Sequence, residues 1–458
     1  MNKMQRPFAV YVAWTALLLV APCFAQTSTF HLAEQAPWWM DPPETWGAVD
    51  PRGDFIGLNG RHDVRPLRCP YLIICKDYSF GNNSFQFSGD NRVQFSSEND
   101  VSIGSYDEIV VTAVGDVMLG TTFPDLSGAD LPPNDGADLL QEVTPLLKRG
   151  DVVLGNLEGP MVDNGVSGKC RGKALGRCFA FRVPTRYGAH LKTAGFNVMG
   201  LANNHAMDFG AEGRESSRHV LDEQGIAHTG EVGDVAHLTA KGKKIDVIAF
   251  ATYPGAFNFL DLDDALETIR RARAAADLVI VSFHGGAEGA SHQHVAPGDE
   301  TFLGEDRGDL RKFAHAAIDA GAQLVIGSGP HVVRAMEIYQ GKLIAYSLGN
   351  FATYGPFNLN GENGLSLILE VHLAPDGSFF RGQIHPVRQE KPGGPKLDPK
   401  LSIVPILRSL SHKDFQQSGV VVGPRGELWL PGTEVPECSN APDLLEQPLY
   451  SRLCSIFP

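Results

Sequence analysis

The chain has 458 residues, of which 43% are hydrophobic and 20% are charged, and its formal net charge is −14. This composition is typical of a globular protein with a large core, and it excludes a disordered chain and a repetitive fibre. The acidic balance, without any basic run, excludes a nucleic-acid-binding protein, because that affinity comes mainly from clustered Lys and Arg. At about 150 residues per domain, the length predicts two or three domains.

The first 25 residues have the features of an export signal. Lys3 and Arg6 give a positive start, an apolar stretch follows, and small residues lead up to Ala25. The apolar stretch is shorter than the roughly 20 residues that span a bilayer, so cleavage after Ala25 is favoured over an uncleaved membrane anchor. Lipidation at Cys23 is the other alternative, and the proline before it disfavours that processing. We expect an exported protein of the periplasm or cell envelope.

Cleavage of the signal would remove one of the seven cysteines and leave six, an even number that suits disulfide bonding in an exported chain. The six fall into local pairs, and short loops are easy to close. The predicted disulfides are Cys69–Cys75, Cys170–Cys178 and Cys438–Cys454. A zinc site is disfavoured, because no pair has the two-residue spacing with a matching second pair.

Residues 26–106 are rich in Pro, Gly, Asn and Ser, with scattered aromatic residues and few helical patterns. We interpret them as an irregular or short-stranded extension that the Cys69–Cys75 disulfide closes. A region of different character begins at Asp107, where apolar strands and amphipathic helices start to alternate. The strands predicted first are 108–116, 152–158 and 197–204. The helices predicted between and after them are 138–150 and 186–195.

The alternation continues in the second half of this region. The predicted elements are strands over 278–286 and 323–329, a helix over 310–321, a hairpin around Gln340-Gly341 and a strand over 365–373. Such alternation predicts an α/β layered fold whose active residues lie at the carboxyl ends of the strands. The predicted division is a signal over 1–25, the extension over 26–106, the α/β domain over 107–357 and a Pro-rich C-terminal segment over 358–458.

Polar side chains that can bind a metal follow five of the apolar strands. They are Asp116, then Asn156 with Glu158, then Asn203, Asn204 and His205, then His284 with Glu288, and last His331. Each alone has an ordinary structural interpretation as a helix cap, a turn residue or a hydrogen-bonded core histidine. Five such coincidences favour one shared site, because the carboxyl ends of strands in an open sheet meet at one crevice.

A mixture of carboxylate, imidazole and amide oxygen suits a divalent ion such as zinc, manganese or iron. The candidate ligands are Asp116, Asn156, Glu158, Asn204, His284 and His331. One or two such ions would lower the pKa of a bound water and offset charge at the attacked centre. His205 is the candidate proton donor to a leaving group. Asp208 would either orient His205 or cap the following helix.

Six motifs carry a resemblance to a known family. In chain order they are VTAVGDVMLG, GNLEGPMV, GLANNHAMDFG, SFHGGAE, GSGPHVV and IAYSLGNF. They resemble the bacterial capsule-synthesis CapA family, whose members are associated with poly-γ-glutamate production and export, over roughly residues 108–352. The resemblance implies a calcineurin-like metallophosphatase fold, a four-layer αββα sandwich, and an exported or membrane-associated location.

By the same resemblance, Asp116, Asn204-His205, His284 and His331 occupy metal-site motifs, and Asn156 and Glu158 lie where a bridging carboxylate is usual. The sequence departs from the metallophosphatase pattern at several positions. Met118 replaces a histidine, as it does in CapA proteins. Ser328 and Gly329 stand where one or two further histidines are usual, and Gly285 stands where a tryptophan is usual. Fewer imidazoles leave a single-metal site, or a site that only binds, as alternatives to two metals.

Two functions follow as hypotheses. The first is an exported metal-dependent hydrolase or transferase that acts on an amide or phosphoester bond, with poly-γ-glutamate as the implied polymer. The second is a non-catalytic accessory protein that holds an anionic polymer during export, with envelope biosynthesis proteins as further partners. Its densest cationic stretch is Arg171, Lys173, Arg177, Arg182 and Arg186. The residues assigned to substrate binding are Arg182, Glu288 and Ser328. An envelope protein for another polymer is a third possibility, because fold and motif do not fix the substrate.

Overall fold

The computed structural model describes residues 108–124, 130–170 and 178–433, together with the backbone of short strands between residues 47 and 103. The chain divides into two compact units, Met1–Tyr106 and Asp107–Pro458. The expected export signal lies outside the described residues, as do the cysteine pairs at 69 and 75 and at 438 and 454. Arg171, Lys173 and Arg177 of the cationic stretch also lie outside them.

The described strands of the first unit are short and antiparallel. One two-stranded sheet pairs β1 (Gly47–Val49) with β2 (Phe55–Gly57). A four-stranded sheet has the order β3 (Tyr78–Phe80), β4 (Asn83–Phe87), β5 (Val93–Ser96) and β6 (Val101–Ile103). These strands agree with the short-stranded alternative for this region.

The first large sheet of the second unit has ten strands and is mixed. Its parallel half consists of β10 (Ala227–Thr229), β9 (Val198–Gly200), β8 (Val152–Leu157) and β7 (Ile109–Met118). The antiparallel half continues with β21 (Leu365–Leu373), β22 (Phe379–Arg388), β25 (Glu427–Trp429) and β24 (Val421–Val422). Two further short strands belong to this sheet: β20 (Asn350–Thr353) pairs with β7, and β23 (Lys396–Leu397) pairs with β22.

The second large sheet has seven strands. Its order is β11 (Ala236–Ala240), β12 (Lys243–Ala251), β14 (Leu278–His284), β17 (Leu324–Ser328), β19 (Lys342–Ala345) and β18 (Met336–Tyr339), with β13 (Phe257–Asn258) beside β12. The four central strands, β12 to β19, run parallel. A separate hairpin consists of β15 (Glu300–Phe302) and β16 (Glu305–Gly308).

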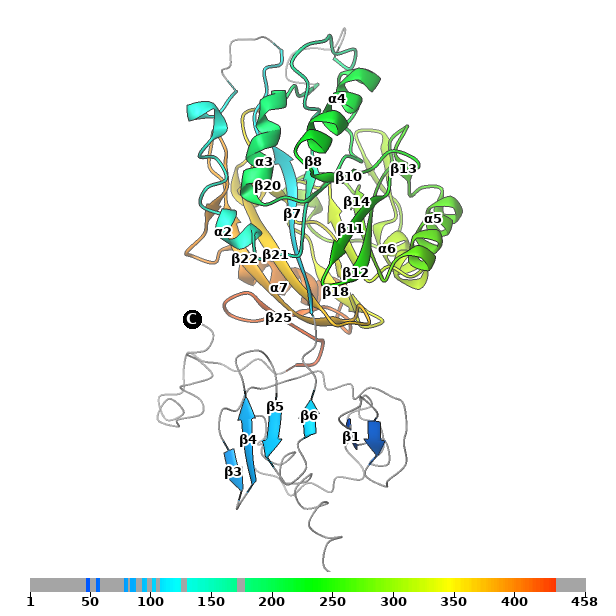
Figure 1. The fold of residues 1–458 in the computed structure, drawn as a ribbon. Helices are drawn as coiled ribbons and strands as arrows, with labels where there is room; N and C mark the ends of the chain where they lie inside the picture. The colour runs from blue at the N-terminus through cyan, green and yellow to red at the C-terminus, as the bar shows by residue number, and fades with distance from the viewer. Residues whose placement is uncertain are drawn as a thin grey trace, which may run out of the picture. The chain divides into compact units, whose positions relative to one another are not determined.

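Helices cover the outer face of each large sheet (Figure 1). Those on the first sheet are α2 (Thr144–Leu147), α3 (Gly188–Ala194) and α4 (Gly210–Glu223). Those on the second are α5 (Leu262–Ala275) and α6 (Leu310–Asp319), and α7 (Ile403–Asp414) contributes to the core between the sheets. Single turns of 3-10 helix are η3 (Pro133–Gly136), η4 (Thr185–Tyr187), η5 (Ala290–His292) and η6 (Gly361–Gly364).

Three apolar cores define four layers. Along β21, Leu367, Leu369 and Val371 pack in the core between the two sheets, whereas Ile368 packs in the core under α2, α3 and α4. A third core lies between the second sheet and helices α5 and α6. Strands buried on both faces need apolar side chains at successive positions, which explains the continuous apolar runs of the sequence. The α/β class and the αββα layering predicted from the sequence are therefore confirmed.

Most predicted elements are present, and the helix predicted over 138–150 is wrong. That segment forms turns followed by α2, which is only four residues long and carries Pro145 in its first turn. Proline lacks an N–H and clashes with the carbonyl four residues earlier, so one continuous helix cannot pass through this point. The predicted hairpin is confirmed, with Gln340 and Gly341 at positive φ as its two-residue turn requires.

The ten-stranded sheet contains strands from before and after residue 357 in the chain. Strands β7 and β20 come before this residue, and β21 and β22 come after it. The division of the chain into the four predicted segments stays a prediction. None of the helices in the described part of the chain is long and apolar enough to cross a bilayer.

Candidate metal centre

The polar side chains predicted from the strand ends lie where the two large sheets meet. Asp116 is in β7, Asn156 is near the end of β8, and His284 is the last residue of β14. The amide nitrogen Nδ2 of Asn156 donates to Oδ1 of Asp116 at 2.8 Å and lies 3.2 Å from Nδ1 of His284. Asn156 therefore links the carboxyl ends of strands from both sheets, because it is hydrogen-bonded to Asp116 and lies close to His284.

A close approach of two backbones sets the position of Asp116. The backbone N–H of Asp116 donates to the carbonyl of Gly349 at 3.0 Å. A Cβ atom on the preceding residue, Gly115, would lie only 1.9 Å from that carbonyl oxygen. Glycine is therefore required at 115 for β7 to bring the Asp116 carboxylate to this point.

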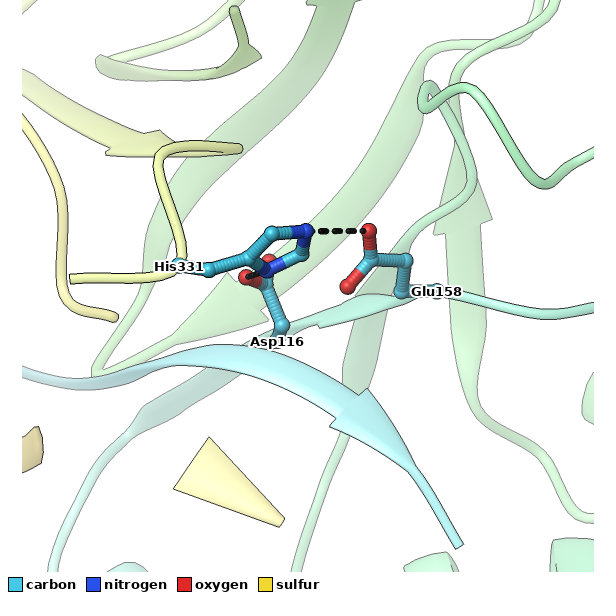
Figure 2. Close-up of side chains that lie close together, drawn as sticks. All are labelled: Asp116, Glu158 and His331. Atoms are coloured by element: carbon cyan, nitrogen blue, oxygen red, sulfur yellow. Dashed lines mark hydrogen bonds and ion pairs between the residues drawn. The ribbon is translucent and has the colours of Figure 1, made fainter. Parts of the chain in front are cut away.

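Asp116, Glu158 and His331 form a compact cluster (Figure 2). One ligand atom from each residue lies within 4.8 Å of the others, and no other cluster of three such residues is found in the described ranges. Nδ1 of His331 is 3.0 Å from Oδ2 of Asp116, and its Nε2 is 3.6 Å from Oε1 of Glu158. Both carboxylates are fully buried, and the imidazole is almost so.

Two of these side chains carry polar atoms that lack hydrogen bonds. Neither carboxylate oxygen of Glu158 has a hydrogen-bond partner among the described residues, and Nε2 of His284 has none either. Nε2 of His284 and Oε1 of Glu158 lie 3.9 Å apart. An unpaired carboxylate in a protein interior is costly unless a cation or hydrogen bonds offset it. The donor set therefore fits a divalent metal ion.

The electrostatics of the cluster also favour a cation at this point. Burial, together with the neighbouring Asp116 carboxylate, raises the pKa of Glu158 well above its usual value. Burial disfavours the charged form of His331, but Glu158 and Asp116 outweigh it and raise the pKa of that imidazole to about 10. A positive charge at this point is thus strongly favoured by the two carboxylates.

His284 is held in the form that binds metals. Complete burial lowers its pKa well below the usual value, so the ring is neutral. Oγ of Ser328 donates to the carbonyl of Phe283 at 3.1 Å and lies 3.2 Å from Nδ1 of His284, so this oxygen can accept the Nδ1–H. Nδ2 of Asn156, which can only donate, lies equally close to the same Nδ1, and only the tautomer that donates from Nδ1 to Ser328 leaves the lone pair of Nε2 facing Glu158. Ser328 therefore contacts a candidate ligand directly.

His331 has a left-handed backbone conformation, with φ of 59°, that residues other than glycine rarely adopt. Asn350, at the start of β20, supports it: its Oδ1 lies 3.0 Å from Nδ1 of His331, and its Nδ2 donates to the His331 carbonyl at 3.3 Å. Strained residues of this kind concentrate at functional sites. Asn350 was not among the predicted site residues, although it lies within the motif IAYSLGNF.

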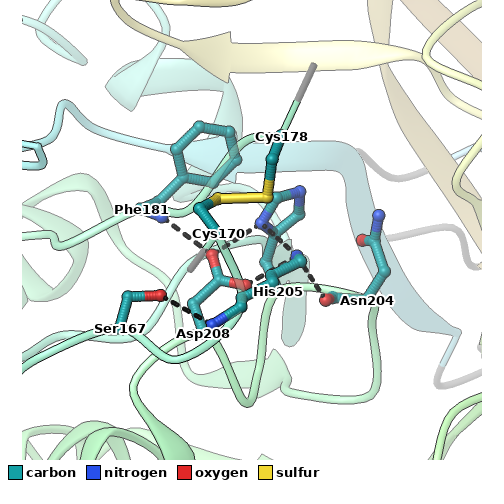
Figure 3. Close-up of a disulfide and its surroundings, with 8 residues drawn as sticks. Ser167, Cys170, Cys178, Phe181, Asn204, His205 and Asp208 are labelled. Carbon is teal, nitrogen blue, oxygen red and sulfur yellow. Dashed lines mark hydrogen bonds and ion pairs between the residues drawn. A yellow bond between two sulfur atoms is a disulfide. The ribbon is translucent and has the colours of Figure 1, made fainter. Parts of the chain in front are cut away.

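His205 and Asp208 form a second hydrogen-bonded group (Figure 3). Nδ1 of His205 is 2.7 Å from Oδ2 of Asp208. Asp208 does not cap α4, whose N-cap residue is Phe209 and has no side-chain cap, and its contact with His205 is compatible with the orienting role, which stays a prediction. Burial lowers the pKa of His205. The nearby Asp208 carboxylate acts to raise this pKa, and the Lys169 ammonium acts to lower it further. The ring is therefore neutral at rest, and Nε2 is the nitrogen left to exchange a proton.

The loop before His205 is fixed by Asn203. Its Nδ2 donates to Oδ1 of Asn156 at 3.1 Å and to the carbonyl of Leu157 at 2.8 Å, and its Oδ1 accepts from the backbone N–H of His205 at 3.0 Å. Oδ1 of the neighbouring Asn204 is buried and has no hydrogen-bond partner within the described part of the chain. Asn204 therefore keeps the free amide oxygen that a ligand role requires.

Glu288 extends the site toward the β15–β16 hairpin. Its Oε2 is 4.0 Å from Nε2 of His331, and its Oε1 accepts from NH2 of Arg307 at 2.7 Å. Arg307 is buried, and it also donates to the hydroxyl of Tyr253. No local motif marked Arg307 or Tyr253, because their relation to the site depends on a hairpin that folds back over β14.

Arg182 is used within the fold. Its Nε and NH2 donate to Oγ1 and the carbonyl of Thr122 at 2.9 and 2.8 Å, and its guanidinium lies over the ring of Phe209. Its substrate-binding role therefore stays a prediction, as do the roles of Glu288 and Ser328. The Cys170–Cys178 disulfide is confirmed, with its two Cα atoms 5.6 Å apart.

Comparison with known proteins identifies relatives of one kind. The family model for the bacterial capsule synthesis protein PGA_cap matches residues 110–354. The capsule biosynthesis protein CapA of Bacillus anthracis is 26% identical over 312 residues, which cover 64% of this chain and 69% of that protein. The PGA biosynthesis protein CapA of Bacillus subtilis is 27% identical over 258 residues, with 52% and 62% covered.

A probable polyglutamine synthesis accessory protein of Mycobacterium tuberculosis is 29% identical over 233 residues, which cover 44% of this chain and 55% of that protein. The chain thus spans from about half to about two thirds of the length of these curated relatives.

Among solved structures, weak similarity is found to a nucleotidase and to a phosphatase. A 5′-nucleotidase precursor from Thermus thermophilus matches with 11% identity and a TM-score of 0.35, over 69% of this chain and 61% of that one. A purple acid phosphatase from yellow lupin matches with 10% identity and a TM-score of 0.30, over 68% and 57%. Similarity this weak carries no information about the chemistry of the site.

Proposed function

The chain belongs to the bacterial capsule synthesis protein PGA_cap family, and on that premise we propose that it is an exported, metal-dependent hydrolase or transferase that acts in the production or processing of poly-γ-glutamate. The names of the Bacillus relatives support the polymer, because one is a capsule protein and the other a PGA biosynthesis protein. The signal-like residues 1–25 support the export.

The observation that carries the catalytic part is the buried carboxylate of Glu158, whose two oxygens lack hydrogen-bond partners in the described ranges. It lies beside Asp116, His331 and the unpaired Nε2 of His284. A site used only for packing would satisfy these atoms with hydrogen bonds. A site that holds a cation keeps them free.

The roles of the residues follow from their donors. Asp116, Glu158 and His331 would hold the metal ion, and His284 and Asn204 have free atoms that suit the same use. When bound, zinc, manganese or iron supplies Lewis acidity at an amide or phosphoester bond. His205 exchanges a proton at Nε2, and Asp208 fixes the ring by accepting the Nδ1–H.

The second candidate is an accessory protein that binds the polymer without cutting it. One observation favours it: fewer imidazoles are present, because position 118 is Met where metallophosphatases usually have a histidine, and positions 328 and 329 are Ser and Gly where they usually have one or two more. The relative in Mycobacterium tuberculosis carries the word accessory in its name.

Two measurements on the purified full chain test the proposal. Elemental analysis should find a divalent metal in the unaltered protein, and its content should fall in Asp116→Ala and His284→Ala but not in Asp138→Ala, an exposed aspartate away from the site. Incubation with poly-γ-glutamate should then shorten the polymer only when metal is present. Polymer that is bound but not shortened would establish the accessory function, and a metal-free, folded protein would overturn the enzymatic proposal.

A further inference from the structure

The carboxylate of Asp208 has three partners that come from different segments of the chain. Nζ of Lys169 donates to its Oδ1 at 2.6 Å, the backbone N–H of Phe181 donates to its Oδ2 at 2.7 Å, and Nδ1 of His205 lies 2.7 Å from the same Oδ2. The Asp208 side chain is completely buried, and that of Lys169 is 30% exposed. Lys169 is thus the cation that offsets the buried charge orienting His205.

Lys169 contacts more than the carboxylate. Its Nζ also donates to the backbone carbonyl of Asn204 at 2.9 Å and lies 3.2 Å from Nδ1 of His205. One ammonium group therefore touches three residues of the loop that follows β9. None of these contacts reaches Asp116, Glu158 or His331.

The Cys170–Cys178 disulfide joins the two segments that hold Asp208. Lys169 directly precedes Cys170, and Phe181 follows Cys178 by three residues. Figure 3 shows the disulfide beside His205, Asp208 and Phe181. A lysine side chain has several rotatable bonds and loses much entropy when it is fixed. A crosslink next to its backbone reduces the freedom that has to be lost.

Phe181 fixes the plane of the same imidazole. Its ring stacks on His205 with centroids 4.2 Å apart, and its other neighbour is Phe357, with centroids at 5.1 Å. Phe357 in turn meets His331 edge to face at 5.6 Å. The crosslinked segments therefore hold His205 both through hydrogen bonds to Asp208 and through ring stacking.

We propose that Lys169 is a positioning residue for the His205–Asp208 pair and that the Cys170–Cys178 disulfide keeps it in place. Loss of either one frees the His205 ring while the Asp116–Glu158–His331 cluster keeps its geometry. The positioning rests on these contacts alone. Only its consequence for turnover rests on the proposed function.

The test is the NMR signal of the His205 Nδ1–H, which a hydrogen bond to a buried carboxylate shifts far downfield and protects from exchange with water. The signal is assigned by its absence in His205→Gln. It should be present in the unaltered protein, lost in Lys169→Met and retained in Lys169→Arg. Lys192→Met is the matched control, since Lys192 is exposed and touches the carbonyl of Gly225.

The double variant Cys170→Ser with Cys178→Ser should lose the signal as well. If that variant does not fold, as judged by circular dichroism, the Lys169 variants decide. With p-nitrophenyl phosphate as a probe, kcat should fall about tenfold in Lys169→Met with little change in KM, a part of what proton transfer contributes. An unchanged Nδ1–H signal in Lys169→Met would overturn the proposal. A lost signal in a protein that holds no metal would leave the positioning intact and overturn only the proposed function.

Discussion

Nε2 of His331 lies 3.6 Å from Oε1 of Glu158. This distance is too long for a hydrogen bond. It is close to the separation of two ligands on one tetrahedral ion, which is about 3.4 Å for bonds of roughly 2.1 Å. The pair is therefore arranged as two ligands around a common point.

Glu158→Gln keeps the shape of the side chain and removes its charge. We expect metal affinity to fall at least tenfold, because a neutral amide is a poorer ligand than a carboxylate. Stability of the metal-free protein should rise, because burial and, to a lesser extent, the Asp116 carboxylate raise the pKa of Glu158 and make its ionised form costly in the fold, a cost that the neutral amide avoids. The expected increase in Tm is about 1–3 °C.

Metal titration and calorimetry of the metal-free forms measure both effects of Glu158→Gln. Glu212→Gln, an exposed glutamate in α4, is the matched control. A variant that binds metal as well as the unaltered protein, with a lower Tm, would show that Glu158 is a structural residue.

Asn350→Ala should weaken metal binding although Asn350 is not a ligand. Its Oδ1 and Nδ2 hold the imidazole and the backbone of His331, whose φ is positive. Outer hydrogen bonds of this kind typically change metal affinity about 10–100-fold. Equilibrium dialysis against buffered zinc measures the change, and Asn360→Ala, at an exposed position, should have no effect. Equal zinc affinities of Asn350→Ala and Asn360→Ala would contradict the proposed role of Asn350 in holding His331.

Gly115→Ala should damage the fold and the site together. The added methyl group would meet the carbonyl oxygen of Gly349 at 1.9 Å, and the backbone must move to relieve the contact. Overpacking in a close-packed core typically costs about 1–3 kcal/mol. Gly168→Ala is the control, since no atom lies within 4 Å of its added Cβ. The free energy of unfolding in urea and the metal content should both fall in Gly115→Ala, and neither should change in Gly168→Ala. A tolerated Gly115→Ala would mean that β7 and residue 349 are less closely apposed.

His372 should make stability depend on pH away from the site. Burial disfavours its charged form, but hydrogen bonds to Glu108 and Glu370 outweigh this and raise the pKa of His372. A histidine with a raised folded pKa stabilises most below its unfolded value of about 6.5 and loses this contribution as the pH rises through the folded pKa. Hydrogen bonds from His372 and His385 hold the pKa of Glu370 below its usual range, so that group contributes above about pH 4.5.

The stabilisation that His372 provides should therefore be larger near pH 5.5 than near pH 9, by about 1–2 kcal/mol. Urea unfolding of His372→Gln and of the unaltered chain at both pH values measures this difference. His219→Gln is the control, because His219 is exposed and its ion pair is with an exposed glutamate. A destabilisation of His372→Gln that is the same at both pH values would contradict the raised pKa.

The parts of the fold and site that the sequence predicts are those with a local signal. Apolar runs such as 278–284 must be strands buried on both faces, and the polar residues that end them must meet at one edge. This reasoning brings together Asp116, Glu158 and His331, which lie close together in the structure. Pairing between cysteines eight residues apart was also predictable, because a short loop leaves few other partners.

The remainder depends on contacts between distant segments. Lys169 reaches Asp208 only because a disulfide and a loop bring them together, and Arg307 reaches Glu288 only through a hairpin. Strands as short as β24 and β25 carry too little pattern to be recognised, so the completion of the first sheet after β21 was not predicted. The helix expected over 138–150 fails because a proline overrides its apolar spacing.

Anomalous X-ray diffraction from crystals of the full chain grown with manganese or zinc tests the central claim most directly. We expect an anomalous peak within bonding distance of Asp116, Glu158 and Nε2 of His331. A well-ordered structure with no such peak, in which the Glu158 carboxylate is instead hydrogen-bonded to protein or water, would contradict it.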